Sequence, residues 1–286
     1  MKNNNFWFKD KDNVDIFVYR WLPDGKPKAI VQIAHGAAEH GARYSHVGKA
    51  FTTAGYAVYA NDHRGHGKTG QKFGKLGDLG PGGWDSTVHV LKELTDIIKK
   101  EQLNIPLFLL GHSWGAGLTK DYLRRWGKEL NGVILTGTSG LPSRRVNSKA
   151  QDRNLNVLIK NPKTSFDWLT RDENEVQKYI NDPLCGFLFT DNNSLVRQSL
   201  RDAYKKLYDS KYDADIPKDL PIYAFVGSED SIGGERGIQA LTEHYKKVGI
   251  KDISYKVYSG GRHEMFNEIN RDEVILDVLY WLETHI

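Results

Sequence analysis

The segment LFLLGHSWGAG, residues 107–117, is an apolar run that ends at a serine between glycines. Ser113 is the centre of a G-x-S-x-G pattern, with Gly111 and Gly115 on either side, between a predicted strand and a predicted helix. A nucleophile on so sharp a turn adopts strained backbone angles, and its close neighbours must lack side chains to avoid clashes. The helix that begins there points its amide dipoles at the serine and favours developing negative charge. The pattern predicts a nucleophilic serine.

A serine hydroxyl is a weak nucleophile until a base removes its proton. Among ten histidines, His263 has the expected position, because it lies in a loop between the last predicted strand and the final helix. In an open parallel sheet, groups that must meet lie at the carboxyl ends of the strands. His112 adjoins the serine, but its side chain is expected to point into the fold. We predict His263 as the base and expect other histidines to shape loops at the same edge: His35, His40, His63 and His66.

The acid that orients the imidazole is expected at the end of another strand. Asp230 comes just after the apolar segment 222–226, and the adjacent Glu229 offers a second carboxylate. Asp252 precedes a predicted strand, which places it at the opposite edge of the sheet. Either carboxylate after the segment could serve. We predict Asp230, because serine, aspartate and His263 then follow the chain order described for this motif.

An oxyanion site requires two backbone amides, one from the residue after the serine and one from the loop after the third strand. The first is predicted to be the amide of Trp114. The second lies in HGAAEHGARY, residues 35–44, where Gly36 permits a bend and Ala37 offers its amide.

These residues require a scaffold of alternating strands and helices. Apolar runs bounded by turn residues predict strands over 14–21, 28–35, 56–61, the run after Pro106, 132–136, 221–226 and 253–258. Helical periodicity occurs around 47–53, over 90–98, after Ser113, up to residue 241 and in the final segment. A glycine-rich loop is expected after residue 61. The alternation predicts an α/β fold with a mainly parallel sheet covered by helices on both faces.

The alternation stops between about residues 140 and 218. This stretch is polar, carries scattered aromatic residues and shows no obvious strand. We interpret it as a mostly helical cap, so that residues 1–139 and 219–286 form the core and residues 140–218 form an insertion.

The 286 residues include 40 basic and 36 acidic residues, interspersed, for a net charge of +4. Binding to nucleic acid is not expected, because phosphate tracking requires a concentrated basic stripe. No apolar stretch approaches the roughly 20 residues that span a bilayer, and the N-terminus lacks the apolar core of a signal peptide. The single cysteine, Cys185, excludes an internal disulfide and a cysteine-based metal site, and we expect an ordinary buried thiol. A cytoplasmic protein is expected.

Four motifs resemble those of the α/β-hydrolase superfamily, within it the branch of monoacylglycerol lipases, lysophospholipases and S33-type serine aminopeptidases. They are His35-Gly36-Ala37-Ala38-Glu39-His40 with Arg43-Tyr44, Asp62-His63-Arg64-Gly65-His66-Gly67, Gly111-His112-Ser113-Trp114-Gly115, and Tyr179 before Asp182-Pro183-Leu184. The resemblance extends from about residue 10 to the C-terminus. It implies a core sheet of about eight strands, a helical cap after the sixth, and hydrolysis of an ester of one fatty acyl chain without a cofactor or metal.

The resemblance also implies that Glu39, Arg43 and Tyr179 line a pocket for a glycerol group. A carboxylate can accept from glycerol hydroxyls, and a guanidinium or phenol can donate to them. Alternatively, Glu39 and Arg43 pair to hold the loop that carries Ala37. The branch usually has methionine at the position of Trp114, so the indole is expected to narrow the acyl channel. The polar cap favours at most transient contact with a membrane surface.

Two other functions remain open. A peptidase of the proline aminopeptidase type shares the fold and the triad, and it would hold a substrate amine with acidic groups of the cap, where Glu173 and Glu175 are available. A non-catalytic receptor could retain the hydrolase pocket, because an intact triad is compatible with binding alone.

Overall fold

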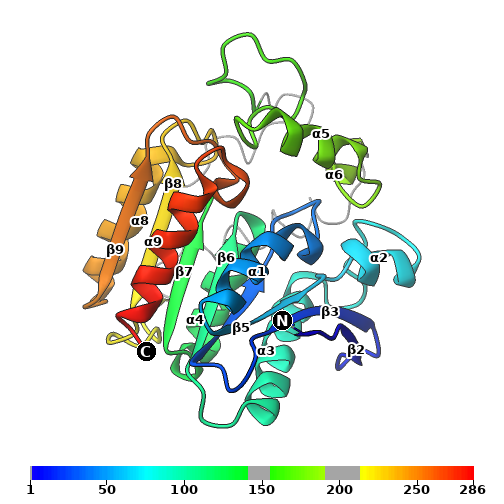
Figure 1. The fold of residues 1–286 in the computed structure, drawn as a ribbon, viewed down its shortest axis with the longest axis vertical. Coiled ribbons are helices and arrows are strands. Elements are labelled where there is room, and N and C mark those ends of the chain that lie inside the picture. Colours follow the sequence, from blue (N-terminus) through cyan, green and yellow to red (C-terminus); the bar gives the residue numbers. More distant parts are fainter. Residues whose placement is uncertain (1, 141–154, 191–212) are drawn as a thin grey trace.

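The structure is a computed structural model, which describes residues 2–140, 155–190 and 213–286. A central sheet crosses the molecule, with helices on both of its faces (Figure 1). Its strands are β1 (Lys2–Asn3), β2 (Phe6–Lys9), β3 (Asp15–Leu22), β4 (Ala29–Ala34), β5 (Tyr56–Asn61), β6 (Leu107–His112), β7 (Gly132–Thr136), β8 (Ile222–Gly227) and β9 (Ile253–Tyr258). In the described part of the chain their order is β1-β3-β5-β4-β6-β7-β8-β9, and β2 pairs with β3.

Every pairing from β5 to β9 is parallel, whereas the pairings of β3 with β1, β2 and β5 are antiparallel. Counted from β2, these elements make eight strands, of which β7 is the sixth. The expectation of a mainly parallel sheet of about eight strands is therefore confirmed. The chain crosses from β5 to β6 past β4, so β4 and β6 are parallel neighbours. The loops that follow these two strands therefore lie side by side at the carboxyl end of the sheet.

Helices cover both faces because each carries one apolar side. The longer helices are α1 (Ser45–Thr53), α2 (Gly67–Phe73), α3 (Gly83–Glu101), α4 (Trp114–Trp126), α8 (Gly234–Val248) and α9 (Arg271–Glu283). One core cluster joins α3, α4 and α8 to the sheet through residues such as Leu91, Leu118 and Leu241. The other joins α1 and α9 to the opposite face through Phe51 and Val278. Strands β4 to β8 are buried along their whole length, as expected for parallel strands covered on both faces.

Three elements differ from the sequence-based expectation. β1 and β2 were not predicted, because two residues and four residues with alternating burial give little signal. α2 forms inside the expected glycine-rich loop, although glycine disfavours helices. The Asp62 carboxylate accepts from the amide of Lys68 at 2.7 Å and so satisfies a donor of the first turn. A Cβ atom on Gly70 would lie 2.5 Å from the carbonyl carbon of Gly65, so close packing explains that glycine.

Residues 140–218 lie between β7 and β8, and we call this segment the insertion. Its described part contains α5 (Glu173–Asn181) and α6 (Phe187–Thr190), joined by turns, and both helices lie beyond one end of the sheet (Figure 1). The Asp172 side chain begins α5 by accepting from the amides of Asn174 and Glu175 at 3.0 and 3.3 Å. Residues 141–154 and 191–212 of the predicted cap lie outside the described residues. Across the described ranges, no helix has both the length and the apolar character that crossing a membrane requires.

Candidate active site

Ser113 occupies the sharp turn between β6 and α4. Its backbone angles are φ 53° and ψ −115°, a conformation that residues other than glycine rarely adopt. The turn is held by the amide of Ser113, which donates to the carbonyl of Thr136 at 2.9 Å. A Cβ atom on Gly115 would lie 2.1 Å from the carbonyl oxygen of Ala34, and one on Gly111 would lie 2.4 Å from a threonine hydroxyl. Steric exclusion therefore explains both glycines of the motif.

His263 and Asp230 come together from the loops after β9 and β8. His263 Nδ1 lies 3.0 and 3.1 Å from the two carboxylate oxygens of Asp230, and both side chains are buried. One of these oxygens also accepts from the amide of Ile232 at 2.8 Å. Glu229 is exposed, and Asp252 lies at the opposite end of β9. The structure thus brings Asp230, rather than either other acid, to the histidine.

His263 and Asp230 each favour the charged form of the other. Burial alone would lower the pKa of His263, but the adjacent Asp230 carboxylate raises that pKa above its ordinary value. Burial would likewise raise the pKa of Asp230, and the facing imidazole holds it below its usual range. The ring of His112 lies 4.8 Å from that of His263, and burial lowers the pKa of His112 to about 3. His112 is therefore neutral, buried and directed into the fold, as expected.

Two glycines show how closely the serine and the histidines converge. A Cβ atom on Gly36 would lie 3.0 Å from the His112 ring and 3.4 Å from Cβ of Ser113. A Cβ atom on Gly137 would lie 2.9 Å from Cε1 of His263. The loops after β4, β6, β7 and β9 therefore meet around His112, with Ser113 near one side of its ring and His263 near the other.

The two predicted oxyanion amides belong to residues next to this region, because Ala37 follows Gly36 and Trp114 follows Ser113. Gly36 donates its amide to Glu39 Oε1 at 2.5 Å, so the next amide along the loop is that of Ala37. The following residue, Ala38, has a positive φ of 56°, which bends the loop back. Trp114 is the first residue of α4, and an amide in the first turn of a helix has no carbonyl of the preceding turn to bind.

The predicted glycerol-binding residues form a buried network with one another. Arg43 donates to Glu39 at 2.8 Å, and Tyr44 donates to the other oxygen of Glu39 at 2.9 Å. The Tyr179 hydroxyl donates to the carbonyl of Ala38 at 2.9 Å, and the Arg43 guanidinium lies 4.8 Å from the Tyr179 ring centre. Both carboxylate oxygens of Glu39 are thus occupied by protein donors, and these contacts favour a role in holding the oxyanion loop.

The loop histidines form a buried stack beside this network. The His35 and His63 rings lie 4.0 Å apart, and the Trp114 indole stacks on His66 at 4.8 Å. His35 Nδ1 donates to the carbonyl of Gly36 at 2.7 Å, which ties the stack to the oxyanion loop. Burial lowers the pKa of all three histidines below the ordinary value, and that of His66 to about 4. The expectation that these histidines shape the loops agrees with these contacts.

Within the described residues, a cluster that could hold a metal comprises His40, Asp182 and Cys185, whose ligand atoms all lie within 4.8 Å of one another. His40 Nε2 lies 2.8 Å from an Asp182 oxygen, so the pair ties the oxyanion loop to the end of α5. Burial raises the pKa of the Cys185 thiol, which disfavours the thiolate that would bind a metal. We assign this cluster a structural role.

The chain is similar to several known proteins. The family model described as serine aminopeptidase, S33, matches residues 25–270. The chain belongs to this family. Monoacylglycerol lipase from Mycolicibacterium smegmatis is 30% identical over 93% of this chain and 92% of its own length. Monoglyceride lipase from Homo sapiens is 28% identical over 90% of this chain and 82% of its own.

A solved structure gives a similar result for this S33 family member. The thermostable carboxyl esterase from Bacillus coagulans, in complex with glycerol, matches with a TM-score of 0.87 and 29% identity, and the match covers 100% of this chain and 99% of the esterase. The α/β-hydrolase fold and the class of carboxylic ester hydrolases, both expected from the sequence, are confirmed.

Two residues beside the predicted site of this S33 family chain were not predicted from the sequence. Glu264 follows His263 and accepts from Arg43 in a bidentate pair, at 2.6 and 2.7 Å. Burial raises the pKa of Glu39 against the opposing effect of Arg43, whereas at Glu264 the guanidinium outweighs burial and lowers the pKa to about 2. A buried arginine with one predicted carboxylate partner was the signal that could have pointed to a second acid.

Trp168, in the insertion, is the other missed residue. Its carbonyl accepts from the amide of His263 at 3.3 Å, and its ring lies 4.9 Å from the imidazole. The next carbonyl, of Leu169, accepts from the amide of Glu264 at 2.7 Å. The insertion therefore pairs with the histidine loop through its backbone. Backbone pairing does not depend on side-chain type, so no pattern of residues in the sequence predicts this contact.

Proposed function

We propose that this S33 family hydrolase cleaves esters of a single fatty acyl chain, monoacylglycerols foremost, through an acyl-enzyme on Ser113. His263 removes the hydroxyl proton as the serine oxygen attacks the ester carbonyl, and the Asp230 carboxylate stabilises the imidazolium that forms. The raised pKa of His263 suits a group that must hold this proton until the alcohol leaves.

The oxyanion of the tetrahedral intermediate would receive hydrogen bonds from the amides of Ala37 and Trp114. His263 then returns the proton to the leaving alcohol, and the acyl group remains on Ser113. In the second half of the cycle a water molecule loses its proton to His263 and attacks the acyl-enzyme, which releases the fatty acid and restores the serine. The chemistry requires no group beyond these residues and water.

The observation that carries the proposal is the hydrogen bond of His263 to Asp230, beside a serine held at φ 53°. A fluorophosphonate probe with intact-mass detection tests the serine. One probe per chain is expected in the native protein and none in Ser113→Ala. A folded native protein that does not react with the probe would instead favour a receptor that has kept only the pocket.

The monoacylglycerol assignment is supported by the lipase relatives and by the esterase whose structure holds glycerol. A matched pair of substrates tests it: a monoacylglycerol and a nitrophenyl ester with the same acyl chain. If Glu39 binds glycerol, Glu39→Gln lowers kcat/KM for the monoacylglycerol much more than for the nitrophenyl ester. Equal losses would mean that Glu39 only supports the oxyanion loop, the role that its present hydrogen bonds favour.

An aminopeptidase activity has weaker support, although the matching family model carries that description. Glu173 pairs with Lys163, and Glu175 accepts from Lys178 at 2.8 Å and from Arg271 at 3.2 Å. These acids already have cationic partners and offer a substrate amine little unpaired charge. Hydrolysis of proline nitroanilide at a rate similar to that of a nitrophenyl ester would reverse the preference.

A further inference from the structure

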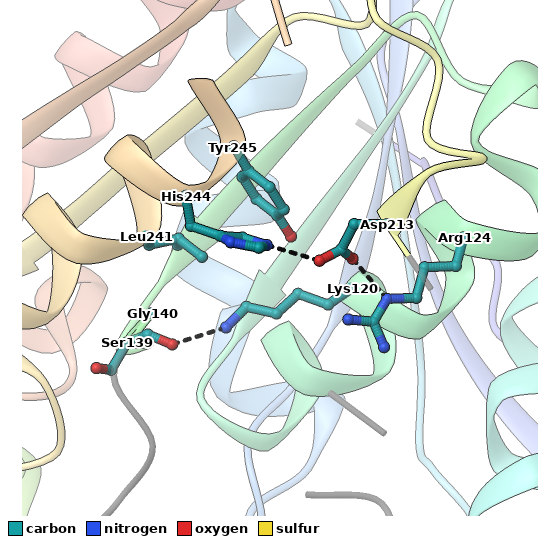
Figure 2. Close-up of a pocket in the computed structure, with 8 residues that line it drawn as sticks. All are labelled: Lys120, Arg124, Ser139, Gly140, Asp213, Leu241, His244 and Tyr245. Atoms are coloured by element: carbon teal, nitrogen blue, oxygen red, sulfur yellow. Dashed lines mark hydrogen bonds and ion pairs between the residues drawn. The ribbon is translucent and has the colours of Figure 1, made fainter. Parts of the chain in front are cut away.

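A cavity of about 40 Å³ lies apart from the serine site, between α4 and α8 (Figure 2). The residues that line it are mostly polar or charged: Lys120, Arg124, Ser139, Gly140, Asp213, Leu241, His244 and Tyr245. Ser139 and Gly140 lie where the chain leaves the core after β7, and Asp213 lies in the segment that leads back to β8. The proposed acyl transfer uses none of these side chains.

Lys120 is the unusual member of the lining. It is only 7% exposed, and its ammonium donates to the carbonyl of Ser139 at 3.0 Å (Figure 2). An ammonium has three donors, and that carbonyl is the one acceptor that the described residues give it. Burying a cation without a counter-charge is costly. Burial and the nearby Arg124 charge, opposed by Asp213, lower the pKa of Lys120 to about 7.

The carboxylate in the cavity is already occupied. One oxygen of Asp213 accepts from Arg124 Nε at 2.7 Å, and the other lies 2.6 Å from His244 Nε2. In Figure 2, Asp213 lies between these two partners, and the Lys120 ammonium points away from it toward Ser139. Both oxygens of Asp213 are thus engaged by Arg124 and His244, and among the described residues the Lys120 ammonium has no hydrogen bond to a carboxylate.

We propose that this cavity binds one small inorganic anion, of the halide class, beside the Lys120 ammonium. The anion supplies a negative charge in contact with the ammonium, which donates to it. A volume of about 40 Å³ holds a few water-sized probes, which admits a halide ion and excludes an acyl chain. Binding of the anion does not depend on the reaction proposed at Ser113.

The position of the site gives the anion a structural consequence. Lys120 belongs to α4, and His244 belongs to α8. Ser139 directly precedes the insertion, and Asp213 lies near the C-terminal end of the insertion. An anion held here would join both helices to both ends of the insertion. Binding should therefore stabilise the folded protein, because only the folded chain assembles the site.

Thermal unfolding at constant ionic strength tests the proposal, with sodium gluconate replaced stepwise by sodium bromide or chloride. For the native chain we expect a rise in Tm of about 2–3 °C at a halide concentration tenfold above Kd. Lys120→Met removes the charge and keeps much of the volume, so its Tm should not respond. Lys128→Met, at an exposed lysine just after α4, is the matched control and should respond like the native chain.

The pH dependence gives a second readout. Protonated Lys120 binds the anion, so the halide effect should be full below pH 7 and fade above it. Among the described residues that line the cavity, the titratable and charged groups facing Lys120 are Arg124 on the same helix, Asp213 in the returning segment, and His244 and Tyr245 on α8. In His244→Gln the halide effect should still fade above pH 7, because the group that loses its proton is the Lys120 ammonium and not the imidazole.

Crystals soaked in bromide give the direct test. An anomalous peak in this cavity, within hydrogen-bond distance of Lys120 Nζ and absent in Lys120→Met, would establish the site. If bromide leaves the cavity unoccupied and halides raise the Tm of native chain and Lys120→Met equally, the proposal is wrong, and water alone solvates the ammonium. The soaked native crystal keeps the test decisive even if Lys120→Met does not fold.

Discussion

Arg43 binds Glu264 through two hydrogen bonds, at 2.6 and 2.7 Å, across 221 residues of sequence. The pair connects the loop that carries Ala37 to the residue that follows His263. The proposed oxyanion site and the proposed base are therefore positioned by one buried ion pair. Removing one partner of such a pair leaves an uncompensated buried charge.

Glu264→Gln tests this connection. We expect a loss of about 3 kcal/mol in the free energy of unfolding, the lower end for a broken buried pair, because Glu39 still contacts Arg43. We also expect kcat for a nitrophenyl ester to fall with little change in KM, because a shifted imidazole affects the transition state more than binding. Urea denaturation and steady-state kinetics measure both. Glu273→Gln, at a side chain 54% exposed, should leave both unchanged.

Ser113→Ala should abolish ester hydrolysis while the fold is retained. Loss of a triad member commonly lowers kcat by a factor on the order of 10⁴–10⁶. A purified variant that keeps even a tenth of the activity would exclude Ser113 as the nucleophile. Ser113→Gly should be more stable than Ser113→Ala by roughly 1 kcal/mol in the free energy of unfolding, because glycine adopts φ 53° without strain. Thermal unfolding of the two variants measures the difference.

Asp230→Asn should slow turnover strongly, because an amide does not stabilise the imidazolium. The same change removes the charge that raises the pKa of His263. In the native enzyme kcat/KM should therefore rise with pH through a value above 6.5, and in the variant this limb should move to lower pH. Glu229→Gln, at an exposed position, should alter neither rate nor profile. The opposite pattern would assign the acid to Glu229.

The histidine stack predicts loss of stability in acid. His35, His63 and His66 bind protons less readily when folded than in the unfolded chain, so their stabilising effect is full above pH 6.5 and declines as the pH falls below it. Each contributes a slope of about 1.4 kcal/mol per pH unit, and for His66 the decline extends to about pH 4. Urea denaturation between pH 7 and pH 5 should show that the free energy of unfolding depends less steeply on pH in His66→Gln than in the native protein. His89 is partly exposed, so His89→Gln is the control and should keep the native slope. Equal slopes for His66→Gln and the native protein would contradict the prediction.

Trp114→Met tests the acyl channel. If the indole blocks part of it, the variant should prefer longer acyl chains while short esters react nearly as before. A pocket difference of one or two methylenes is worth about 1–3 kcal/mol in selectivity. An unchanged profile across nitrophenyl esters of increasing length would mean that the indole serves the stack with His66, where it is already buried.

The sequence located the residues that follow strand ends, because apolar runs and glycine turns are local signals. Ser113, Asp230 and His263 were placed in this way, and the strand over 56–61 was predicted with the observed bounds. Contacts between distant segments left no such signal. Glu264 could be recognised only once the fold brought it to Arg43. α2 was missed because the close packing that requires its glycines exists only in the folded chain.

The backbone pairing of the insertion with the histidine loop has a consequence for engineering. The amides of His263 and Glu264 bind two successive carbonyls, of Trp168 and Leu169. A chimera that exchanges the insertion for that of another S33 enzyme must therefore offer two acceptors at the same spacing, whatever its side chains. An insertion without them would leave two buried amides unsatisfied beside the base. The insertion can thus be exchanged between related enzymes only if its main chain keeps this geometry, whereas its side chains near the histidine loop can differ.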